Sequence, residues 1–142
     1  VTVSSKLHTK GEIDFDSFKG EKPYNSQIAY GQSKLANVLF STELAKRLEG
    51  TNVTSNALNP GAVRTDIVRD LPWIVRQVIY LMFISVEKGA QTNIQLASDE
   101  SLNAVTGKYF DQTKRVDCSP QADDKTLREK LWSVSESLVA GY

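Results

Sequence analysis

The sequence has very little cysteine and no excess of charge of either sign. Cys118 is its only cysteine, which excludes an internal disulfide and a metal cluster built on thiolates. Lysine plus arginine number 17, and so do aspartate plus glutamate, so the formal net charge is zero. A neutral chain lacks the long-range field that gathers nucleic acid or an anionic membrane. We therefore expect no nucleic-acid partner, and the sequence predicts no metal site.

Long hydrophobic runs are lacking too. The run WIVRQVIYLMFI, residues 73–84, is strongly apolar, but it is only a dozen residues long and contains Arg76 and Gln77. A membrane-spanning helix needs about 20 apolar residues, so this run does not predict one. Two interpretations stay open: a helix of the core, or an apolar surface that covers a ligand or dips into a bilayer.

Methionine is almost absent, since Met82 is the only one and the chain begins with Val1. The first residues, VTVSS, are a β-branched run followed by two serines, which is typical of the end of a strand. We expect from this abrupt start that the chain is a piece of a longer protein.

Strand-like and helix-like segments alternate along the chain, which predicts an α/β fold. A long polar loop, residues 6–27, separates the first strand from an amphipathic helix, and such loops are usually functional. A strand, a helix and a second strand in succession form a right-handed crossover with parallel strands. The expected strands are residues 1–5, 53–58 and 107–111, and the expected helices are residues 29–48, 87–98 and 125–138.

The first expected helix begins with a tyrosine and carries a lysine four residues later, Tyr30 and Lys34. Residues four apart share a helix face, with β-carbons about 5–6 Å apart. A nearby ammonium group favours the phenolate form of tyrosine, which suits the pair to exchange a proton near neutral pH. The pair is common in helices, so a solvated surface pair, on a polar face that includes Glu43, is the alternative.

Two further segments follow the expected strands. Ser5 stands at the end of the first strand, and the carboxyl ends of parallel strands face the ligand crevice. The segment NPGAVRT, Asn59 to Thr65, follows the second strand, and its Pro60-Gly61 turn lets backbone approach a planar ligand. A capping serine and a plain connecting loop are the structural alternatives.

In this order and on these elements, VSS, YGQSK and NPGAVRT resemble the second half of short-chain dehydrogenases/reductases. More narrowly, the chain is similar to the retinol dehydrogenase branch of that family. The segments typical of the branch are GEIDFDSFKGEKPYNSQIAY, QSKLANVLFSTELAKRL and KGAQTNIQLA. The resemblance extends over essentially all 142 residues.

The resemblance implies a fold and a reaction. Residues 1–142 would be part of an NAD(P)-binding domain, the C-terminal half of a doubly wound Rossmann-type parallel sheet that carries the catalytic groups. The enzyme would interconvert an alcohol and a carbonyl by hydride exchange with NADP(H), with NAD as the alternative cofactor. Retinol and retinal are the substrates expected from the branch, while steroids and lipid aldehydes stay open. An intracellular location at the endoplasmic reticulum membrane is also implied.

The resemblance also implies a role for each matching residue. Tyr30 would be the general acid/base, Lys34 would favour its phenolate and bind the nicotinamide ribose, and Ser5 would position the substrate oxygen. The nicotinamide end of the cofactor would be lined by Tyr30, Lys34, Pro60, Gly61, Val63 and Thr65, with Thr65 near the carboxamide. Trp73 and Ile74, in the apolar run, are expected to contact the substrate.

Part of the family pattern is not found in these residues. The sequence contains no G-x-x-x-G-x-G turn to hold the cofactor pyrophosphate, and it lacks the family's catalytic asparagine upstream of the serine. We therefore expect the chain alone to be inactive and the edge of its first strand to be uncovered. A non-catalytic Rossmann-fold binding or regulatory protein is the alternative function. A sugar-nucleotide epimerase also uses Tyr-x-x-x-Lys, but the loop before Tyr30 and the Pro-Gly turn fit it poorly.

Overall fold

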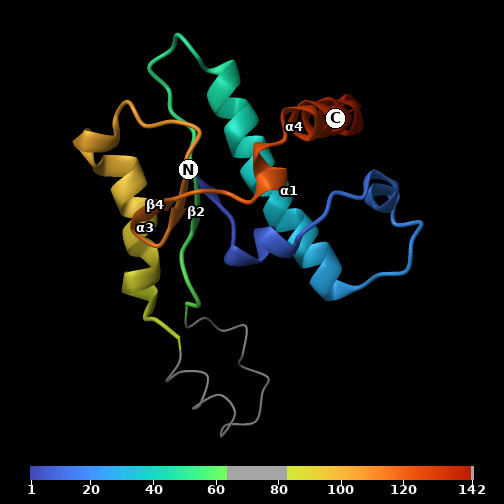
Figure 1. Ribbon diagram of the computed structural model, residues 1–142, viewed down its shortest axis with the longest axis horizontal. Coiled ribbons are helices and arrows are strands. Elements are labelled where there is room, and N and C mark those ends of the chain that lie inside the picture. Colours follow the sequence, from blue (N-terminus) through green and yellow to red (C-terminus); the bar gives the residue numbers. More distant parts are fainter. Residues whose placement is uncertain (64–82, 142) are drawn as a thin grey trace, which may run out of the picture.

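A computed structural model of the protein describes residues 1–63 and 83–141. Within these residues, four short strands and three α-helices alternate along the chain (Figure 1). The strands are Thr2–Val3 (β1), Ala57–Asn59 (β2), Tyr109–Asp111 (β3) and Lys114–Val116 (β4). The α-helices are Ser26–Arg47 (α1), Val86–Ser98 (α3) and Lys125–Val139 (α4). Four 3₁₀ helices join them: Lys6–Lys10 (η1), Phe15–Lys19 (η2), Glu100–Leu102 (η4) and Pro120–Asp123 (η5).

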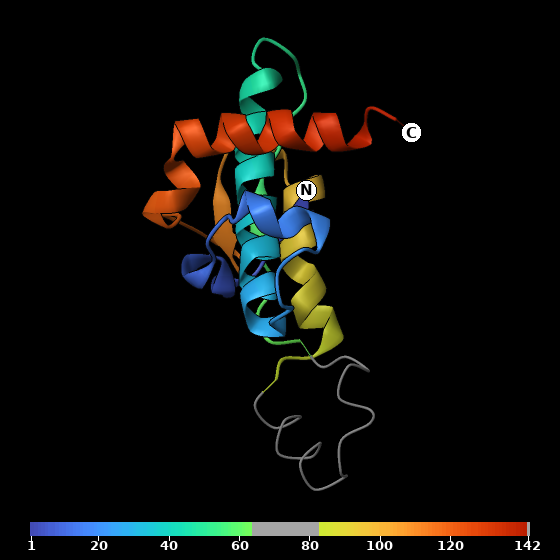
Figure 2. The same ribbon diagram turned by 90° about the vertical axis from the view of Figure 1, so that its right-hand side faces the viewer.

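The strands form one open, mostly parallel sheet in the order β1-β2-β3-β4. β1 pairs parallel with β2, where Val3 lies opposite Leu58, and β2 pairs parallel with β3, where Leu58 lies opposite Phe110. The two figures at right angles show α1 and α3 on opposite faces of this sheet (Figures 1 and 2). The predicted α/β class and parallel crossover are therefore confirmed, and the carboxyl ends of three strands share one edge.

All three expected strands have different limits in the structure, and the third begins at Tyr109 rather than at Gly107. β1 ends at Val3, although the amide of Ser4 still donates to the carbonyl of Leu58 at 2.7 Å. The second strand begins at Ala57 rather than at Val53, which is exposed. Val53 led to a predicted strand start that was too early, because a single apolar side chain in a loop cannot be told from one in a strand by the local sequence.

The sequence-based prediction missed β4, and it allowed one short helical turn in the long loop, where the structure has two 3₁₀ helices. β4, Lys114–Val116, is exposed at every position and follows β3 through a tight turn, in which Gln112 has a φ of 54°. A short edge strand with polar residues has no hydrophobic alternation by which to recognise it. In the loop, η1 begins at the Ser5 cap, and η2 begins at the Asp14 cap.

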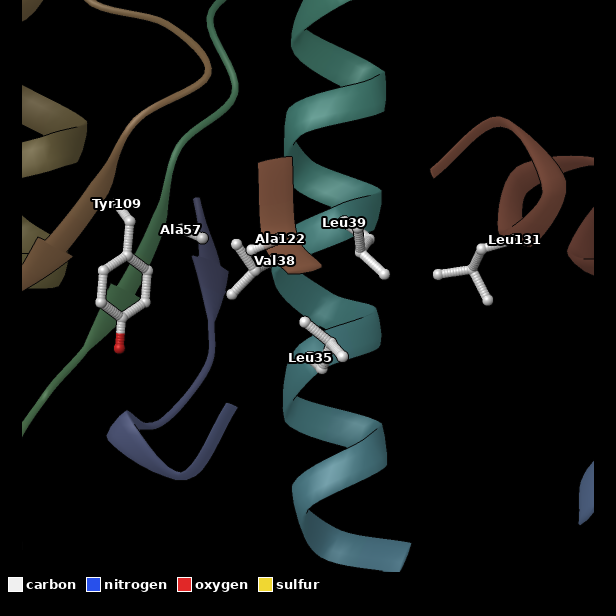
Figure 3. Packing of buried hydrophobic residues seen from close by; sticks show 7 residues of the cluster. All are labelled: Leu35, Val38, Leu39, Ala57, Tyr109, Ala122 and Leu131. Atoms are coloured by element: carbon white, nitrogen blue, oxygen red, sulfur yellow. The ribbon is translucent and has the colours of Figure 1, made fainter. Parts of the chain in front are cut away.

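Helix α1 is the centre of the hydrophobic core (Figure 3). The side chain of Asn25 caps it by accepting from the amides of Gln27 and Ile28, at 3.0 and 3.1 Å, so the helix begins three residues before the expected start. Its apolar stripe packs between the sheet and α4. The core cluster consists of Leu35, Val38, Leu39, Ala57, Tyr109, Ala122 and Leu131.

Helix α3 packs through its small residues, not through the face that its apolar residues predict. The spacing of Ala90, Ile94 and Ala97 predicts that these residues face inward, but Ile94 is 60% exposed, while Gly89 and Thr92 are buried. A β-carbon on Gly89 would lie on a methyl group of Val63. The helix therefore approaches the chain at a position without a side chain, which the hydrophobic pattern does not reveal.

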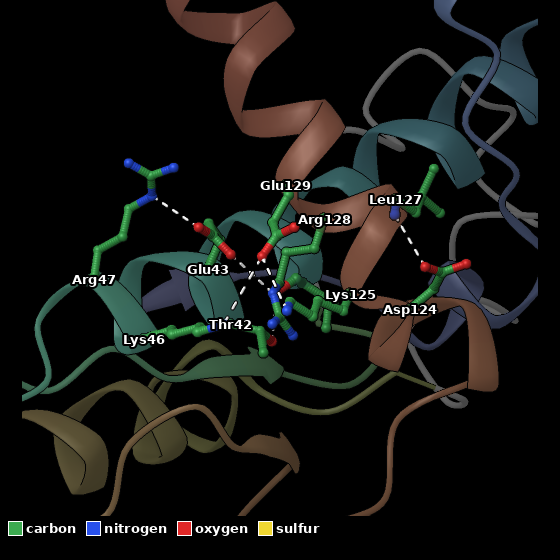
Figure 4. A network of polar contacts seen from close by, with 10 residues as sticks. Thr42, Glu43, Lys46, Arg47, Asp124, Lys125, Leu127, Arg128 and Glu129 are labelled. Atoms are coloured by element: carbon green, nitrogen blue, oxygen red, sulfur yellow. Dashed lines mark hydrogen bonds and ion pairs between the residues drawn. The ribbon is translucent and has the colours of Figure 1, made fainter.

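A buried carboxylate joins α1 to α4 (Figure 4). Glu43, expected on the polar face of its helix, is buried and accepts from Nε of Arg47 at 2.8 Å and from Nε of Arg128 at 2.9 Å. Docking of α4 covers Glu43, so the expectation of a solvated face was wrong at this position. The sequence could not show it, because Arg128 lies 85 positions away.

No helix in the described ranges is long and apolar enough to span a bilayer. Most of the apolar run, residues 73–82, lies outside the described residues.

Candidate functional site

Ser5 lies where β1 passes into η1, at the carboxyl edge of the sheet. Its backbone is extended, with φ −154° and ψ 156°, and its Oγ accepts a hydrogen bond from the Leu7 amide at 3.3 Å. The serine is thus a helix cap, as the structural alternative proposed. A hydroxyl has one donor and two acceptor lone pairs, so the capping bond leaves the O–H free to donate to a ligand.

The neighbouring Ser4 fixes this strand end against α1. Ser4 is buried, and its hydroxyl donates to the carbonyl of Lys34 at 2.7 Å. The side-chain amide of Asn37 donates to the carbonyl of Val3 at 3.0 Å. The two bonds hold the segment that leads into Ser5 against the helix that carries Lys34. Sequence reasoning missed Ser4, although alternation along a strand puts the neighbour of an outward-facing Ser5 on the opposite face.

Gly11 allows the segment after η1 to lie against the first turns of α1. A β-carbon on Gly11 would overlap the carbonyl group of Gly31. The segment that begins at Ser5 therefore approaches the backbone of α1 immediately after Tyr30, and only glycine at position 11 permits this separation. The sequence analysis treated Gly11 as a loop residue and did not assign it a role.

Tyr30 and Lys34 lie together on one face of α1, as their spacing predicts. Nζ of Lys34 is 5.4 Å from the centroid of the Tyr30 ring, which is within the range of a cation–π contact. Tyr30 is 45% exposed. It helps to line a surface groove of about 640 Å³, whose other residues are Leu7, Lys10, Ser26, Gln27, Ile28 and Gly31. The phenol is therefore accessible to a ligand from solvent.

The expected cofactor loop leaves the sheet at the same edge. β2 ends at Asn59, and Gly61 follows with a φ of 89°, a conformation that favours glycine. A β-carbon on Gly61 would lie 3.1 Å from Cδ1 of Ile84, a tight contact to which the isoleucine would have to adjust. Val63 bridges to Ile84 in parallel register. Pro60 completes the turn, while Thr65, Trp73 and Ile74 lie outside the described residues.

Asp111 connects the strand ends at this edge, and the sequence analysis did not single it out. Its Oδ1 accepts from the side-chain amide of Asn59 at 2.8 Å, and its Oδ2 lies 3.3 Å from Nζ of Lys6. The amide of Gln112 donates to the carbonyl of Asn59 at 2.8 Å. These bonds tie the ends of β2 and β3 to η1. An acidic residue at the end of an expected strand was the available signal.

The structure thus places Ser5, the Tyr30–Lys34 pair and the Pro60-Gly61 turn on elements that meet near one edge of the sheet. Ser4 and the Gly11–Gly31 approach join the first two to each other. Within residues 1–63 and 83–141, no three His, Cys, Asp or Glu side chains are grouped so that they could hold a metal ion.

Comparison with known proteins shows which family the chain resembles. The family model described as short chain dehydrogenase matches residues 8–73. Retinol dehydrogenase 14 from Homo sapiens is 46% identical over 98% of this chain. The chain therefore resembles the short-chain dehydrogenase family, as its motifs predict. Retinol dehydrogenase 12 from Mus musculus and retinol dehydrogenase 13 from Homo sapiens are also similar, at 44% and 40% identity over 98% of the chain.

The chain corresponds to less than half of each of these retinol dehydrogenases. It spans 43% of retinol dehydrogenase 14 and 45% of each of the other two. Among solved structures, an uncharacterised protein from Mycobacterium Paratuberculosis matches 96% of this chain and 48% of its own, with a TM-score of 0.62 and 27% identity. The fold and the family resemblance are thus confirmed, while the roles of individual residues stay predictions.

Proposed function

We propose that the whole protein that carries this chain is an NAD(P)-dependent oxidoreductase, which interconverts an alcohol and a carbonyl, and that residues 1–142 supply the catalytic half of its Rossmann-type domain. The hydrogen bond from Ser4 to the Lys34 carbonyl carries this proposal. It fixes the segment that leads into Ser5 against the helix that bears Tyr30 and Lys34. A polarising hydroxyl and a proton-exchanging phenol are the groups that alcohol–carbonyl chemistry needs from the protein.

In the direction of reduction, Tyr30 gives a proton to the substrate oxygen, and in oxidation it takes the proton back. Lys34 stabilises the phenolate that forms, because an ammonium near the ring favours the charged form. Ser5 donates its O–H to the substrate oxygen and keeps its acceptor bond to the Leu7 amide. This bond orients the Ser5 hydroxyl before the substrate binds, which lowers the entropy that must be lost to reach the transition state.

A nicotinamide cofactor fits the turn after β2. Gly61 carries no side chain and has a φ of 89°, so no β-carbon shields the backbone of the Pro60-Gly61 turn from a planar ring. Pro60, Gly61, Val63 and Thr65 would hold the nicotinamide end, and Lys34 would bind its ribose. The cofactor supplies the hydride when bound. We propose NADP(H) over NAD(H), which a comparison of kcat/KM for the two cofactors tests directly.

We further propose an apolar substrate, retinol or retinal being the first to test. The groove beside Tyr30 exposes the apolar side chains of Leu7 and Ile28, which suits the hydrocarbon part of an apolar substrate. The relatives named retinol dehydrogenases favour the same class. Trp73 and Ile74 would extend this apolar contact. Replacing Trp73 with Gln should then raise KM for a long-chain aldehyde much more than for a short one, and equal effects on both would contradict the assignment.

The experiment is a steady-state assay of the whole protein with NADPH and all-trans-retinal, followed by the loss of cofactor absorbance. Retinol formation, absent when Tyr30 is replaced with Phe, is the expected result. A protein that binds NADPH but turns over neither retinal, a steroid ketone nor a lipid aldehyde would instead be a non-catalytic binding protein. Cell fractionation of the whole protein tests the proposed location at the endoplasmic reticulum membrane.

A further inference from the structure

A buried histidine supports the backbone of Ser5. His8 is only 2% exposed, and its Nδ1 lies 2.8 Å from the carbonyl oxygen of Ser5. The same carbonyl accepts from the His8 backbone amide at 3.0 Å. The carbonyl of Ser5 is thereby held by two donors from one residue, at the point where the chain turns from β1 into η1.

The geometry determines which ring nitrogen of His8 carries the proton. A neutral imidazole has one N–H donor and one acceptor nitrogen. The backbone carbonyl of Ser5 can only accept, so Nδ1 must be the donor. Nε2 is then an acceptor, and it is buried without a hydrogen-bond partner among the described residues. An unpaired buried acceptor is costly, so a donor nearby would stabilise this arrangement.

Such a donor lies on the ring packed against His8. The ring centroids of His8 and Tyr109 are 4.6 Å apart, with planes tilted by 58°. Tyr109 is 3% exposed, and its hydroxyl is also buried without a partner among the described residues. Burial, together with the charges of Asp111 and Cys118, raises the pKa of Tyr109, so its hydroxyl stays protonated. Two unsatisfied groups of complementary type thus lie on rings in contact.

We propose that His8 is a positioning residue for Ser5: it is held as the Nδ1–H tautomer by the Ser5 carbonyl, and one water molecule accepts from the Tyr109 hydroxyl and donates to Nε2 of His8. The chain Tyr109–His8–Ser5 connects the middle of the sheet to the serine at its edge. The part that concerns catalysis rests on the function proposed above, because it takes Ser5 as the group that orients the substrate oxygen. The tautomer and the Tyr109 bond do not depend on that function.

The first experiment is ¹⁵N NMR of the whole protein with labelled histidine, in which the signals lost in His8→Asn identify His8. We expect a pyrrole-type Nδ1 and a pyridine-type Nε2, and we expect Tyr109→Phe to shift the Nε2 signal while the Nδ1 signal stays. The opposite tautomer, an imidazolium, or no response of Nε2 to Tyr109→Phe would each overturn the inference. This readout needs no turnover, so an inactive protein would count against the proposed function alone.

The second experiment separates positioning from packing. Asparagine can place an amide N–H where Nδ1 lies, whereas glutamine reaches the position of Nε2. His8→Asn should keep kcat within about twofold, and His8→Gln should lower kcat about tenfold, the equivalent of one hydrogen bond, with KM and the cofactor Kd unchanged. Equal losses in both folded variants, or no loss in either, would refute a positioning role. If His8→Gln does not fold, His8→Leu takes its place as the variant without a donor at the position of Nδ1, with the same expected loss of kcat.

Discussion

Replacing Glu43 with Gln should destabilise the fold more than replacing either arginine that it binds. The Glu43 side chain is 5% exposed and that of Arg128 is 12% exposed, so their ion pair is nearly enclosed between α1 and α4 (Figure 4). The second pair, with Arg47, is at the surface, because that side chain is 45% exposed. The substitution removes the shared charge and leaves the Arg128 guanidinium buried without its carboxylate.

The expected loss of stability follows from how far the Arg128 and Arg47 side chains are exposed. Removing one partner of a buried pair typically costs about 3–5 kcal/mol, whereas a surface pair is worth roughly 0–1 kcal/mol. Glutamine keeps one acceptor oxygen, so we expect Glu43→Gln to lower the free energy of unfolding by about 3 kcal/mol. Arg47→Met should cost about 1 kcal/mol, since it also removes the contact of this guanidinium with the Trp132 ring, 4.3 Å away.

The assay is urea unfolding followed by circular dichroism, applied to Glu43→Gln, Arg128→Met and the double variant. If the charges are coupled, the double variant should be less destabilised than the sum of the single ones, by at least about 2 kcal/mol. Additive losses would refute the reasoning.

The same pair predicts a dependence on pH. Burial raises the pKa of Glu43, but the guanidinium groups of Arg128 and Arg47 outweigh it, so the pKa lies below its usual value of 4.5. A lowered pKa in the folded state means that the contribution is complete above pH 4.5 and is lost as the pH falls through the folded value. Glu43→Gln should therefore lose less stability than the unsubstituted protein between neutral and acid pH.

Three further predictions concern the site and its surroundings. Gly11→Ala should lower the free energy of unfolding by about 1–3 kcal/mol and also lower kcat, because the new methyl group would push η1 away from α1. The control Gly31→Ala should be tolerated, since its β-carbon would lie an ordinary 3.4 Å from the nearest atom. Equal losses in the two variants would argue against the close approach. Gly61→Ala should raise the cofactor Kd, because a residue with a side chain pays about 1–2 kcal/mol to adopt the φ of 89° that shapes this turn. An unchanged Kd would show that this turn is not part of the cofactor site. Burial and nearby carboxylates raise the pKa of Cys118 to about 11. Thiol reagents at pH 8 should therefore modify Cys118 slowly in the folded protein and faster once urea is added. Fast labelling of the folded protein would contradict the burial of this thiol.

The parts of the fold and site that the sequence predicted depend on local patterns. The 3.6-residue period of Leu35, Val38 and Leu39 identified α1, and the four-residue spacing of Tyr30 and Lys34 placed them on one face. The helix start was late by three residues, because Asn25 was taken as a loop residue rather than as a cap.

The missed features join residues far apart in the chain. Ser4 binds a carbonyl 30 positions away, and Asn59 binds Asp111 across 52 positions. Neither partner can be chosen until the helix and the strands are placed, since many serines and carboxylates in the sequence look alike. The prediction of the buried face of α3 was wrong for a related reason. That face is defined by Gly89, which has no side chain and therefore packs closely against Val63.

The most direct measurement compares Tyr30→Phe with Tyr24→Phe in the whole protein. Tyr24 is 82% exposed in the loop before α1, so its substitution removes the same hydroxyl away from the proposed site. The proton-exchange role predicts that Tyr30→Phe lowers kcat by roughly 10²–10⁴-fold, with NADPH still bound, while Tyr24→Phe keeps full activity. Retention of activity in Tyr30→Phe, or an equal loss in both variants, would contradict the assignment of Tyr30 as the acid/base.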